Sequence, residues 1–224
     1  MSIAAATFGS GGSEPYASAL GRADSHLLYL RVAGGAGTVT TMDVSRWHAD
    51  ADDADLTLLS RVTGPVLDIG CGPGRMVRAA MDLGLNAMGL DVSPAAIELA
   101  SRLGGSYLTG SVFDHVPGEG MWQTALLVDG NIGIGGDIAM LLKRCRELLS
   151  ATGEIVVELH ADPSHIDHYI GEVVDSLGGQ SASFPWAEIG LDRLIGLLPQ
   201  LRLALAQFWV SDGRSFCRLA KTAK

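Results

Sequence analysis

The sequence VLDIGCGPGR, at positions 66–75, joins an apolar run to three closely spaced glycines. The apolar run predicts a buried strand, and the segment GRMVRAAMDLG that follows it predicts a helix closed by Gly84. A glycine loop between a strand and a helix leaves backbone N–H groups free to face a ligand, beside the positive end of the helix. The stretch therefore predicts a site in which a ligand lies close to the backbone.

The spacing of these glycines argues against two common nucleotide-binding motifs. The dinucleotide motif GxGxxG has its third glycine three residues after the second, but Gly74 follows Gly72 by two residues and Arg75 stands where the motif needs glycine. The ring of Pro73 leaves less room for a pyrophosphate, and no GK[ST] sequence follows to complete a P-loop. A dinucleotide or a nucleoside triphosphate is therefore disfavoured as the ligand.

Strands and helices alternate regularly from residue 65 to residue 160. Strands separated by helices predict right-handed βαβ units and a parallel sheet, whose carboxyl strand ends share the edge where α/β folds bind ligands. The expected strands are PVLDIG (65–70), NAMGLDV (86–92), SYLTGSV (106–112), TALLVDG (124–130) and GEIVVELH (153–160), and the expected helices are 74–84, 93–105 and 137–150.

The last third of the chain does not continue the regular alternation of strands and helices. Residues 168–189 predict a hairpin, with a helix followed by a strand as the alternative, and residues 190–201 predict a helix. Two strands around Asp212-Gly213 predict a second hairpin. The expected fold class is α/β, a Rossmann-like doubly wound and mostly parallel seven-stranded sheet with an antiparallel edge hairpin, which we assign to a domain at 61–224.

We expect an N-terminal tail and helical cap over residues 1–60. Leucines have helical spacing from Tyr16 to Leu30, and a glycine cluster then interrupts the pattern. The acidic run DADDADLTLLSRV at 50–62 superficially resembles a metal site, but it lacks the glycine turn of a calcium loop. We interpret its acids as helix-start residues.

Composition narrows the class of partner. The formal charge is −9, and the 16 Lys and Arg residues are scattered, which disfavours a nucleic-acid partner. The three cysteines form no CxxC pair, so we expect neither a zinc knuckle nor a disulfide framework. The N-terminus lacks a basic region typical of signal peptides, and no apolar run is long enough for a membrane span. We therefore expect a cytoplasmic protein without a membrane partner, as a monomer or homodimer.

Two acids are expected near the glycine loop. Asp91 ends the second strand, where a carboxylate accepts hydrogen bonds from the ribose hydroxyls of a nucleoside lying across the strand ends. Asp114 follows the third strand, where an adenine amine would lie. Two acids beside a glycine loop suit a nucleoside with a positively charged or zwitterionic tail better than one with phosphates.

These residues resemble the class I S-adenosylmethionine-dependent methyltransferases. The similar segments are VLDIGCGPGR, GLDVSP, GSVFDHVP, ALLVDGNIGIGG and RCRELLSATGEIVVEL. The resemblance covers residues 60–160 well, extends loosely to residue 220, and is weak before residue 45. It implies that the chain is a methyltransferase enzyme, with S-adenosylmethionine as cofactor and S-adenosylhomocysteine as product.

The resemblance also implies roles for individual residues. The glycines lie beside the methionine and ribose parts of the cofactor, Asp68 reaches its amino group, Asp91 takes the ribose hydroxyls, and Asp114 holds the adenine amine. The implied cofactor-binding residues are Asp68, Gly70, Gly72, Gly74, Asp91, Val92, Val112, Phe113, Asp114 and Asn131. Asp129, Gly130 and Asn131 are expected where cofactor and acceptor meet. In the alternative interpretation, Asp68 caps a turn, Asp91 begins the next helix, and Asp114 forms a turn before Pro117.

The acceptor's chemistry decides whether a base is needed. The sulfonium already activates the methyl group, so the protein mainly aligns the reactants and excludes water, but a hydroxyl acceptor must also lose its proton. The candidates for this base are His160, Asp162, Asp129 and His48, of which we expect His160 and Asp129 to be catalytic. His160 directly follows the fifth strand, and imidazole exchanges protons near neutral pH. The alternative is a hydrogen-bonded structural histidine.

The segment HADPSHIDH at 160–168 invites comparison with a metal site. His160, His165 and His168, with Asp162 and Asp167 between them, could ligate a divalent ion. Their spacing matches no compact ligand motif, and the Asp162-Pro163-Ser164 sequence is more typical of a turn into a helix. We therefore expect no metal.

We expect the acceptor to be a small molecule, methylated on a hydroxyl. The [NDS]PP[YFW] tetrad of amino-methylating nucleic-acid enzymes is replaced here by DGNIGI. Residues 42–50 and 183–189 are expected to roof the acceptor pocket, where Trp47, Phe184 and Trp186 either hold an apolar or sugar-like face or pack in the core. There are two alternatives: a non-catalytic cofactor-binding protein and a nicotinamide-dependent oxidoreductase. An oxidoreductase usually needs a Tyr-x3-Lys or similar dyad, which this sequence lacks.

Overall fold

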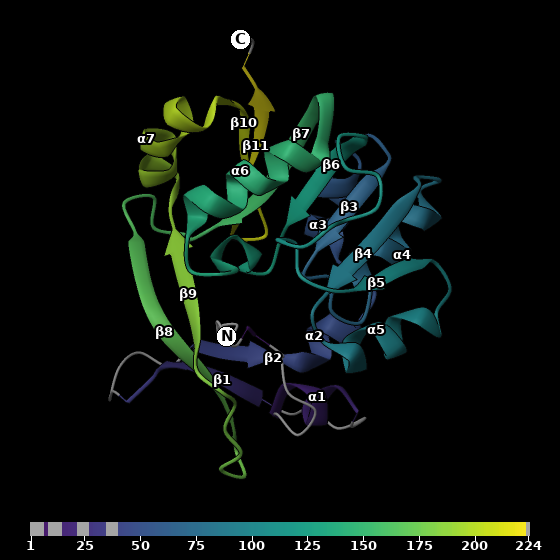
Figure 1. Cartoon of the computed structure of the whole chain (residues 1–224). Helices are drawn as coiled ribbons and strands as arrows, with labels where there is room; N and C mark the ends of the chain where they lie inside the picture. Colours follow the sequence, from purple (N-terminus) through teal and green to yellow (C-terminus); the bar gives the residue numbers. More distant parts are fainter. Residues whose placement is uncertain (1–6, 9–14, 22–26, 35–39, 223–224) are drawn as a thin grey trace.

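A seven-stranded sheet forms the centre of the molecule (Figure 1). The structure is a computed structural model that describes residues 7–8, 15–21, 27–34 and 40–222. In spatial order the strands are β10 (Leu203–Ser211), β11 (Arg214–Lys221), β7 (Leu149–Leu159), β6 (Trp122–Leu127), β3 (Val66–Ile69), β4 (Ala87–Asp91) and β5 (Ser106–Thr109). Strands β3 to β7 are parallel, and β11 is antiparallel to both of its neighbours.

Helices cover both faces of this sheet. The helices are α3 (Asp53–Leu59), α4 (Arg75–Asp82), α5 (Pro94–Ser101), α6 (Ile138–Leu148) and α7 (Leu191–Leu201). Val66 of β3 packs in one core cluster with α3 and α4, whereas Leu67 and Ile69 pack in another with α6 and α7. A strand buried on both sides needs apolar residues on both, which is why β3 is an apolar run with one acid rather than an alternating pattern.

The order of the strands confirms the predicted doubly wound sheet. The chain starts in the middle at β3, moves outward through β4 and β5, and returns to β6 on the other side of β3. The loops after β3 and β6 therefore diverge, and they open a crevice at the carboxyl edge of the sheet. The predicted edge hairpin is β10 and β11, whose turn residues Asp212 and Gly213 have φ values of 48° and 75°.

The predicted helix starts are confirmed by their caps. Ser93 accepts a hydrogen bond from the backbone N–H of Ala96 at the start of α5, and Asp137 caps α6 in the same way. Asp52 and Asp55 form a reciprocal capping box at the start of α3. The acidic run before Leu56 is therefore a helix start, as its composition indicated.

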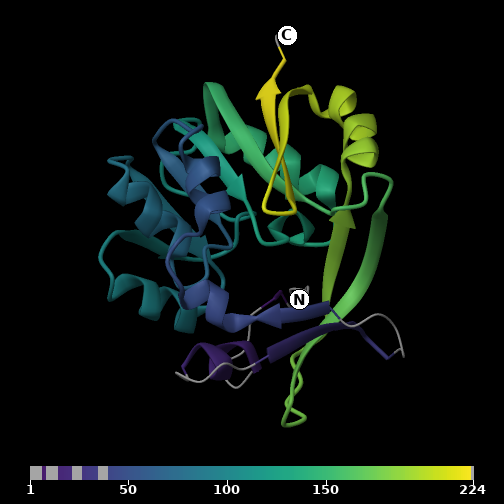
Figure 2. The same cartoon turned by 180° about the vertical axis from the view of Figure 1, so that it is seen from behind.

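A second sheet lies across the carboxyl edge of the first, as Figures 1 and 2 show. Its spatial order is β2 (Thr40–Asp43), β1 (Leu27–Val32), β8 (Ile166–Asp175) and β9 (Phe184–Ile189), and all pairs are antiparallel. Strands β8 and β9 form the hairpin predicted within 168–189. The short helices α1 (Pro15–Leu20) and α2 (Val44–His48) adjoin this sheet.

Two predicted helical segments in this region are strands. Helical structure in the segment 16–30 ends at Leu20, and Leu28 and Leu30 belong to β1, where both are buried and β1 pairs with β8. The turn at 162–164 leads into β8 rather than into a helix, because Ile166 is already paired with Ile189 of β9. In both cases a distant strand supplies backbone hydrogen bonds that local spacing does not reveal.

The second sheet takes strands from both sides of residue 60, so the N-terminal segment and residues 166–189 fold together. The helical cap therefore keeps α1, α2 and α3 and gains two strands. No helix within the described part of the chain is long and apolar enough to span a membrane.

A group of buried charges ties the N-terminal segment to the large sheet. Asp55 of α3 is fully buried, and it forms ion pairs with Arg75 at the start of α4 and with Arg214 at the start of β11. Arg75 also pairs with Asp129 after β6, and Arg214 pairs with Glu158 of β7 at 2.8 Å. The buried guanidinium of Arg75 and the partly buried one of Arg214 thus both have carboxylate partners, as burial of a charge requires.

Asp55→Ala tests this group. The substitution removes one partner from the buried Arg75 and from the partly buried Arg214, so we expect a loss of about 3 kcal/mol in the free energy of unfolding, measured with urea. Asp53→Ala is the matched control, because Asp53 is an exposed acid in the first turn of the same helix. It should cost less than about 1 kcal/mol. Equal losses would show that Asp55 acts only as a helix-start acid.

Candidate functional site

A cavity of about 470 Å³ lies between the carboxyl edge of the large sheet and the four-stranded sheet. Its walls come from the loops that follow β3, β4, β5 and β6, from the end of β7, and from β2, α2 and β9 on the opposite side. The topology thus brings together the segments that sequence analysis singled out at 66–75, 42–50 and 183–189.

The three glycines of the loop have different tasks. Gly70, Gly72 and Gly74 all have positive φ, at 76°, 53° and 89°. A Cβ at Gly70 would lie 2.6 Å from the side-chain nitrogen of Asn131, and one at Gly74 would lie 2.6 Å from the hydroxyl of Tyr107. Gly70 and Gly72 line the cavity, whereas Gly74 begins α4 behind it. The predicted contact of Gly74 with the ligand therefore gives way to a packing role.

Asp91 is fixed at the end of β4 by the loop itself. Its two carboxylate oxygens accept hydrogen bonds from the backbone N–H of Gly72 at 2.9 Å and of Ser93 at 2.8 Å. Burial raises the pKa of Asp91, and the hydrogen bonds from Ser93 and Gly72 counteract part of that rise. Asp91 and Val92 both line the cavity. Asp91 thus braces the glycine loop and also presents a carboxylate to the cavity.

Asp68 is a buried carboxyl group that lines the cavity and is 1% exposed. Neither of its oxygens has a hydrogen-bond partner among the residues that the structure describes. Burial raises the pKa of Asp68 to about 8, and the charges of Asp129 and Asp91 add to the effect. The turn-cap interpretation of Asp68 is therefore not supported, since a capping carboxylate would accept a backbone N–H.

The loop after β5 brings Ser111, Val112 and Phe113 to the cavity, but not Asp114. The backbone N–H of Asp114 bonds the carbonyl of Ser111 at 3.0 Å, which forms a turn, and the Asp114 side chain is exposed. Its backbone carbonyl accepts a hydrogen bond from Arg144 at 2.6 Å. The predicted adenine acid is thus in a turn outside the cavity, as the alternative interpretation held.

The loop after β6 holds Asp129 and Asn131 at the cavity wall. Both carboxylate oxygens of Asp129 are engaged, one by Arg75 and one by Arg214. The side-chain amide of Asn131 donates to the carbonyls of Ile69 and Gly70, at 3.0 Å each. Asn131 therefore holds the glycine loop in place from the neighbouring strand end.

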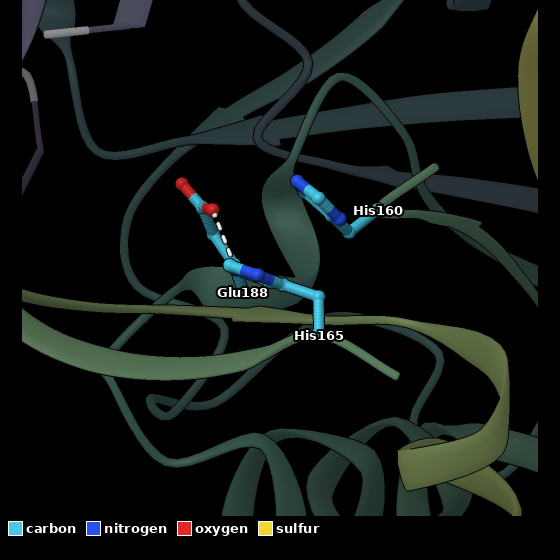
Figure 3. A group of neighbouring side chains, drawn as sticks. All are labelled: His160, His165 and Glu188. Atoms are coloured by element: carbon cyan, nitrogen blue, oxygen red, sulfur yellow. Dashed lines mark hydrogen bonds and ion pairs between the residues drawn. The ribbon is translucent and has the colours of Figure 1, made fainter. Parts of the chain in front are cut away.

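His160 lines the cavity at the end of β7. Its ring stacks on that of His165 with centroids 3.8 Å apart (Figure 3). The backbone N–H of Asp162 donates to Nδ1 of His160 at 3.1 Å. Nε2 of His165 lies 3.1 Å from Glu188, a residue of β9 that also lines the cavity.

The remaining candidates for a base or a metal ligand lie outside the cavity wall. The carboxylate of Asp162 accepts from the backbone N–H and hydroxyl of Ser164, both at 2.9 Å. His168 bonds the carbonyl of Gly136 through Nδ1, Asp167 accepts from the backbone of His168, and His48 is exposed at the end of α2. These four residues are not among the described residues that line the cavity.

Two of the three predicted aromatic residues line the cavity. Trp47 and Trp186 are part of its wall, whereas Phe184 is 1% exposed and packs in the core beneath the four-stranded sheet. The roof formed by 42–50 and 183–189 is therefore present, with Phe184 as its support.

Sequence reasoning missed Tyr16 and Glu188. Tyr16 of α1 lines the cavity, and a Cβ at Gly72 would lie 3.5 Å from its hydroxyl. Burial raises the pKa of Tyr16 well above its usual value, and the charge of Asp91 adds to this. Both residues sit in elements whose position depends on the second sheet, and an isolated tyrosine or glutamate carries no motif that reveals this.

Comparisons with known proteins agree with this geometry. A family model described as a methyltransferase domain matches residues 66–153, whereas a search of curated proteins finds no match. A S-adenosylmethionine-dependent methyltransferase from Bacteroides fragilis, solved with S-adenosylhomocysteine, has a similar structure, with a TM-score of 0.76 at 16% identity over 97% of this chain and 99% of the other.

Two further solved structures share the fold. The 1,6-didemethyltoxoflavin-N1-methyltransferase of Burkholderia thailandensis has a TM-score of 0.58 at 18% identity, covering 80% of this chain and 81% of that one. The amino pentose methyltransferase CalS10 of Micromonospora echinaspora has a TM-score of 0.56 at 14% identity, covering 80% and 94%. At these identities the likeness shows the fold. The chain therefore contains a segment, residues 66–153, that matches a methyltransferase domain, within a fold shared with S-adenosylmethionine-dependent methyltransferases of known structure.

Proposed function

We propose that the chain transfers a methyl group from S-adenosylmethionine to a hydroxyl of a small-molecule acceptor. The observation that carries the proposal is the buried carboxyl group of Asp68, which faces the cavity without a hydrogen-bond partner in the described chain. Residues 61–224 form the cofactor-binding domain in this proposal. The N-terminal segment, with β8 and β9, covers the acceptor end.

The cavity wall fits the cofactor group by group. A positively charged amino group beside Asp68 would offset the cost of burying that carboxylate. Each oxygen of Asp91 accepts one backbone N–H and keeps a lone pair for a ribose hydroxyl. Val92, Val112 and Phe113 offer apolar contact for the adenine. We do not assign Asp114 to the adenine amine, because its side chain lies outside the cavity.

S-adenosylmethionine supplies a methyl group that is already activated on a sulfonium. The protein therefore has to align the acceptor and keep water out, and the second sheet covers the strand ends as this task requires. Trp47 and Trp186 give the acceptor end flat apolar walls, which suit an aromatic or sugar-like molecule. Two of the structural relatives are named for small acceptors as well, 1,6-didemethyltoxoflavin and an amino pentose.

His160 lies where it could remove the proton of the acceptor's hydroxyl. It lies at the cavity wall beside His165 and Glu188. Asp129 lies at the same wall, but both its oxygens are held by guanidinium groups. We therefore assign His160, rather than Asp129, to proton removal, and we assign Asp129 to holding the loop that follows β6.

Titration with S-adenosylhomocysteine and with NAD tests the cofactor. We expect calorimetry to show binding of S-adenosylhomocysteine and none of NAD. Asp91→Ala should weaken that binding at least tenfold, because lost charge-assisted hydrogen bonds cost about 1.5–3 kcal/mol. Asp114→Ala is the matched control and should leave the affinity unchanged. Binding of NAD alone, or full affinity in Asp91→Ala, would contradict the proposal.

A screen of hydroxylated small molecules tests the reaction, with formation of S-adenosylhomocysteine as the readout. For an acceptor found in this way, we expect a methyl ether as product. His160→Ala should lower kcat by about 100-fold or more, since a positioned base contributes at least that factor. The variant should still bind S-adenosylhomocysteine with the wild-type affinity. Products methylated only on nitrogen, or an unchanged kcat, would contradict the assignment.

A further inference from the structure

Three potential metal ligands meet at the acceptor end of the cavity. The ligand atoms of His160, His165 and Glu188 all lie within 4.8 Å of one another. The residues come from the end of β7, the turn before β8, and β9. Figure 3 shows that the two imidazole rings lie over one another and extend toward the carboxylate of Glu188.

Backbone hydrogen bonds fix the relative position of the three residues. The N–H of His160 donates to the carbonyl of Ile189 at 2.9 Å, and the N–H of Gly190 donates to the carbonyl of His165 at 2.8 Å. The end of β7 and the turn before β8 are thus both attached to the end of β9. The backbone positions of the three residues are therefore fixed where the two sheets meet.

The distances suit two ligands of one ion. Metal ions such as Zn²⁺ bind imidazole nitrogen and carboxylate oxygen at about 2.0–2.2 Å, which in tetrahedral geometry separates two ligand atoms by about 3.4 Å. Nε2 of His165 and a carboxylate oxygen of Glu188 are 3.1 Å apart. His160 completes the set from the cavity side.

Neighbouring groups orient these ligands as the outer shell of a metal site does. The hydroxyl of Tyr169 donates to the second oxygen of Glu188 at 2.8 Å, which leaves the first oxygen for an ion. The backbone N–H of Asp162 donates to Nδ1 of His160 at 3.1 Å, and this bond fixes the ring. Nε2 can bind an ion only when the proton is on Nδ1, which would then donate to the carbonyl oxygen of Asp162, 3.5 Å away.

We propose that His160, His165 and Glu188 bind one divalent transition-metal ion. Two imidazoles and one carboxylate are a donor set that suits Zn²⁺ and related ions, and three protein ligands leave a coordination position open. Since His160 and Glu188 line the cavity, that position faces the acceptor. The histidine spacing alone did not indicate this site, because the third ligand lies 23 residues beyond His165.

The inference rests on the proposed function and narrows its acceptor to a molecule with a hydroxyl oxygen that can bind the ion. An ion here would lower the pKa of that hydroxyl. The role of His160 in proton removal, assigned above to a base, would then be that of a ligand that holds the ion. The O–H bond breaks and its proton passes to water. The oxygen bonds the methyl carbon, and the methyl–sulfur bond breaks with its electron pair left on sulfur.

The test is metal binding to the full chain after chelator treatment and dialysis, with Zn²⁺ as the probe in calorimetry and metal analysis. We expect one Zn²⁺ per chain. His165→Ala and Glu188→Gln should each weaken binding at least tenfold, and Tyr169→Phe should weaken it about 10-fold or more through the position of Glu188. Circular dichroism and S-adenosylhomocysteine affinity show whether each variant is folded.

His115→Ala is the matched control. His115 lies 3.4 Å from Glu119 on the surface, so it forms a histidine–glutamate pair without a second imidazole, and its loss should leave the Zn²⁺ stoichiometry and affinity unchanged. Absence of Zn²⁺ binding, or wild-type affinity in His165→Ala, would overturn the inference while S-adenosylhomocysteine binding still supports the proposed function. Zn²⁺ binding without S-adenosylhomocysteine binding would instead leave the metal site standing and defeat the methyl-transfer proposal.

Discussion

The site depends on one buried carboxyl group for which the described chain provides no partner. Asp68 lies in β3, the middle one of the five parallel strands, and lines the cavity. Arg75, seven residues later, is buried as well, but it pairs with Asp55 and Asp129. The guanidinium of Arg75 is therefore paired with other carboxylates and not with Asp68. Burial raises the pKa of Asp68 to about 8. A cationic group of a ligand is the partner that this arrangement lacks.

The buried ion pairs and the second sheet complete the cavity around that group. Asp55, Arg75, Asp129, Arg214 and Glu158 connect α3, α4, β6, β11 and β7, so the N-terminal segment is attached where the strands end. Strands β8 and β9 belong to the four-stranded sheet, in which β8 pairs with β1 and β9 pairs with β8. This pairing places Trp186 and Glu188 of β9 in the cavity wall opposite the glycine loop. One end of the cavity is therefore set by the parallel sheet, and the other by pairing between distant parts of the chain.

Local sequence patterns were sufficient for the parallel sheet and for much of the cofactor end. The alternation of strands and helices, the caps Ser93 and Asp137, and the turn at Asp212-Gly213 are determined by neighbouring residues. The positions of Asp68 and Asp91 follow from the shared carboxyl edge of parallel strands.

What the sequence did not reveal depends on long-range contacts. Leu27 and Leu30 fit a helical spacing with Leu20, but both lie in strand β1, where Leu30 pairs with Val173, which is 143 positions later. Asp114 stands at the expected point in the chain, yet a turn carries its side chain away from the cavity. Glu188 joins His160 and His165 only because β9 pairs with β8, and a ligand supplied by a neighbouring strand leaves no compact spacing to recognise.

The most direct test of the central claim is the proton balance of cofactor binding. Calorimetric titration with S-adenosylhomocysteine at pH 7, in two buffers of different ionisation enthalpy, measures it. With a pKa of about 8, Asp68 is mostly protonated at pH 7 before binding, and an ammonium group beside it favours the carboxylate. The account predicts release of close to one proton per chain in the wild type and none in Asp68→Asn. Binding without proton release in the wild type, or equal release in Asp68→Asn, would contradict it.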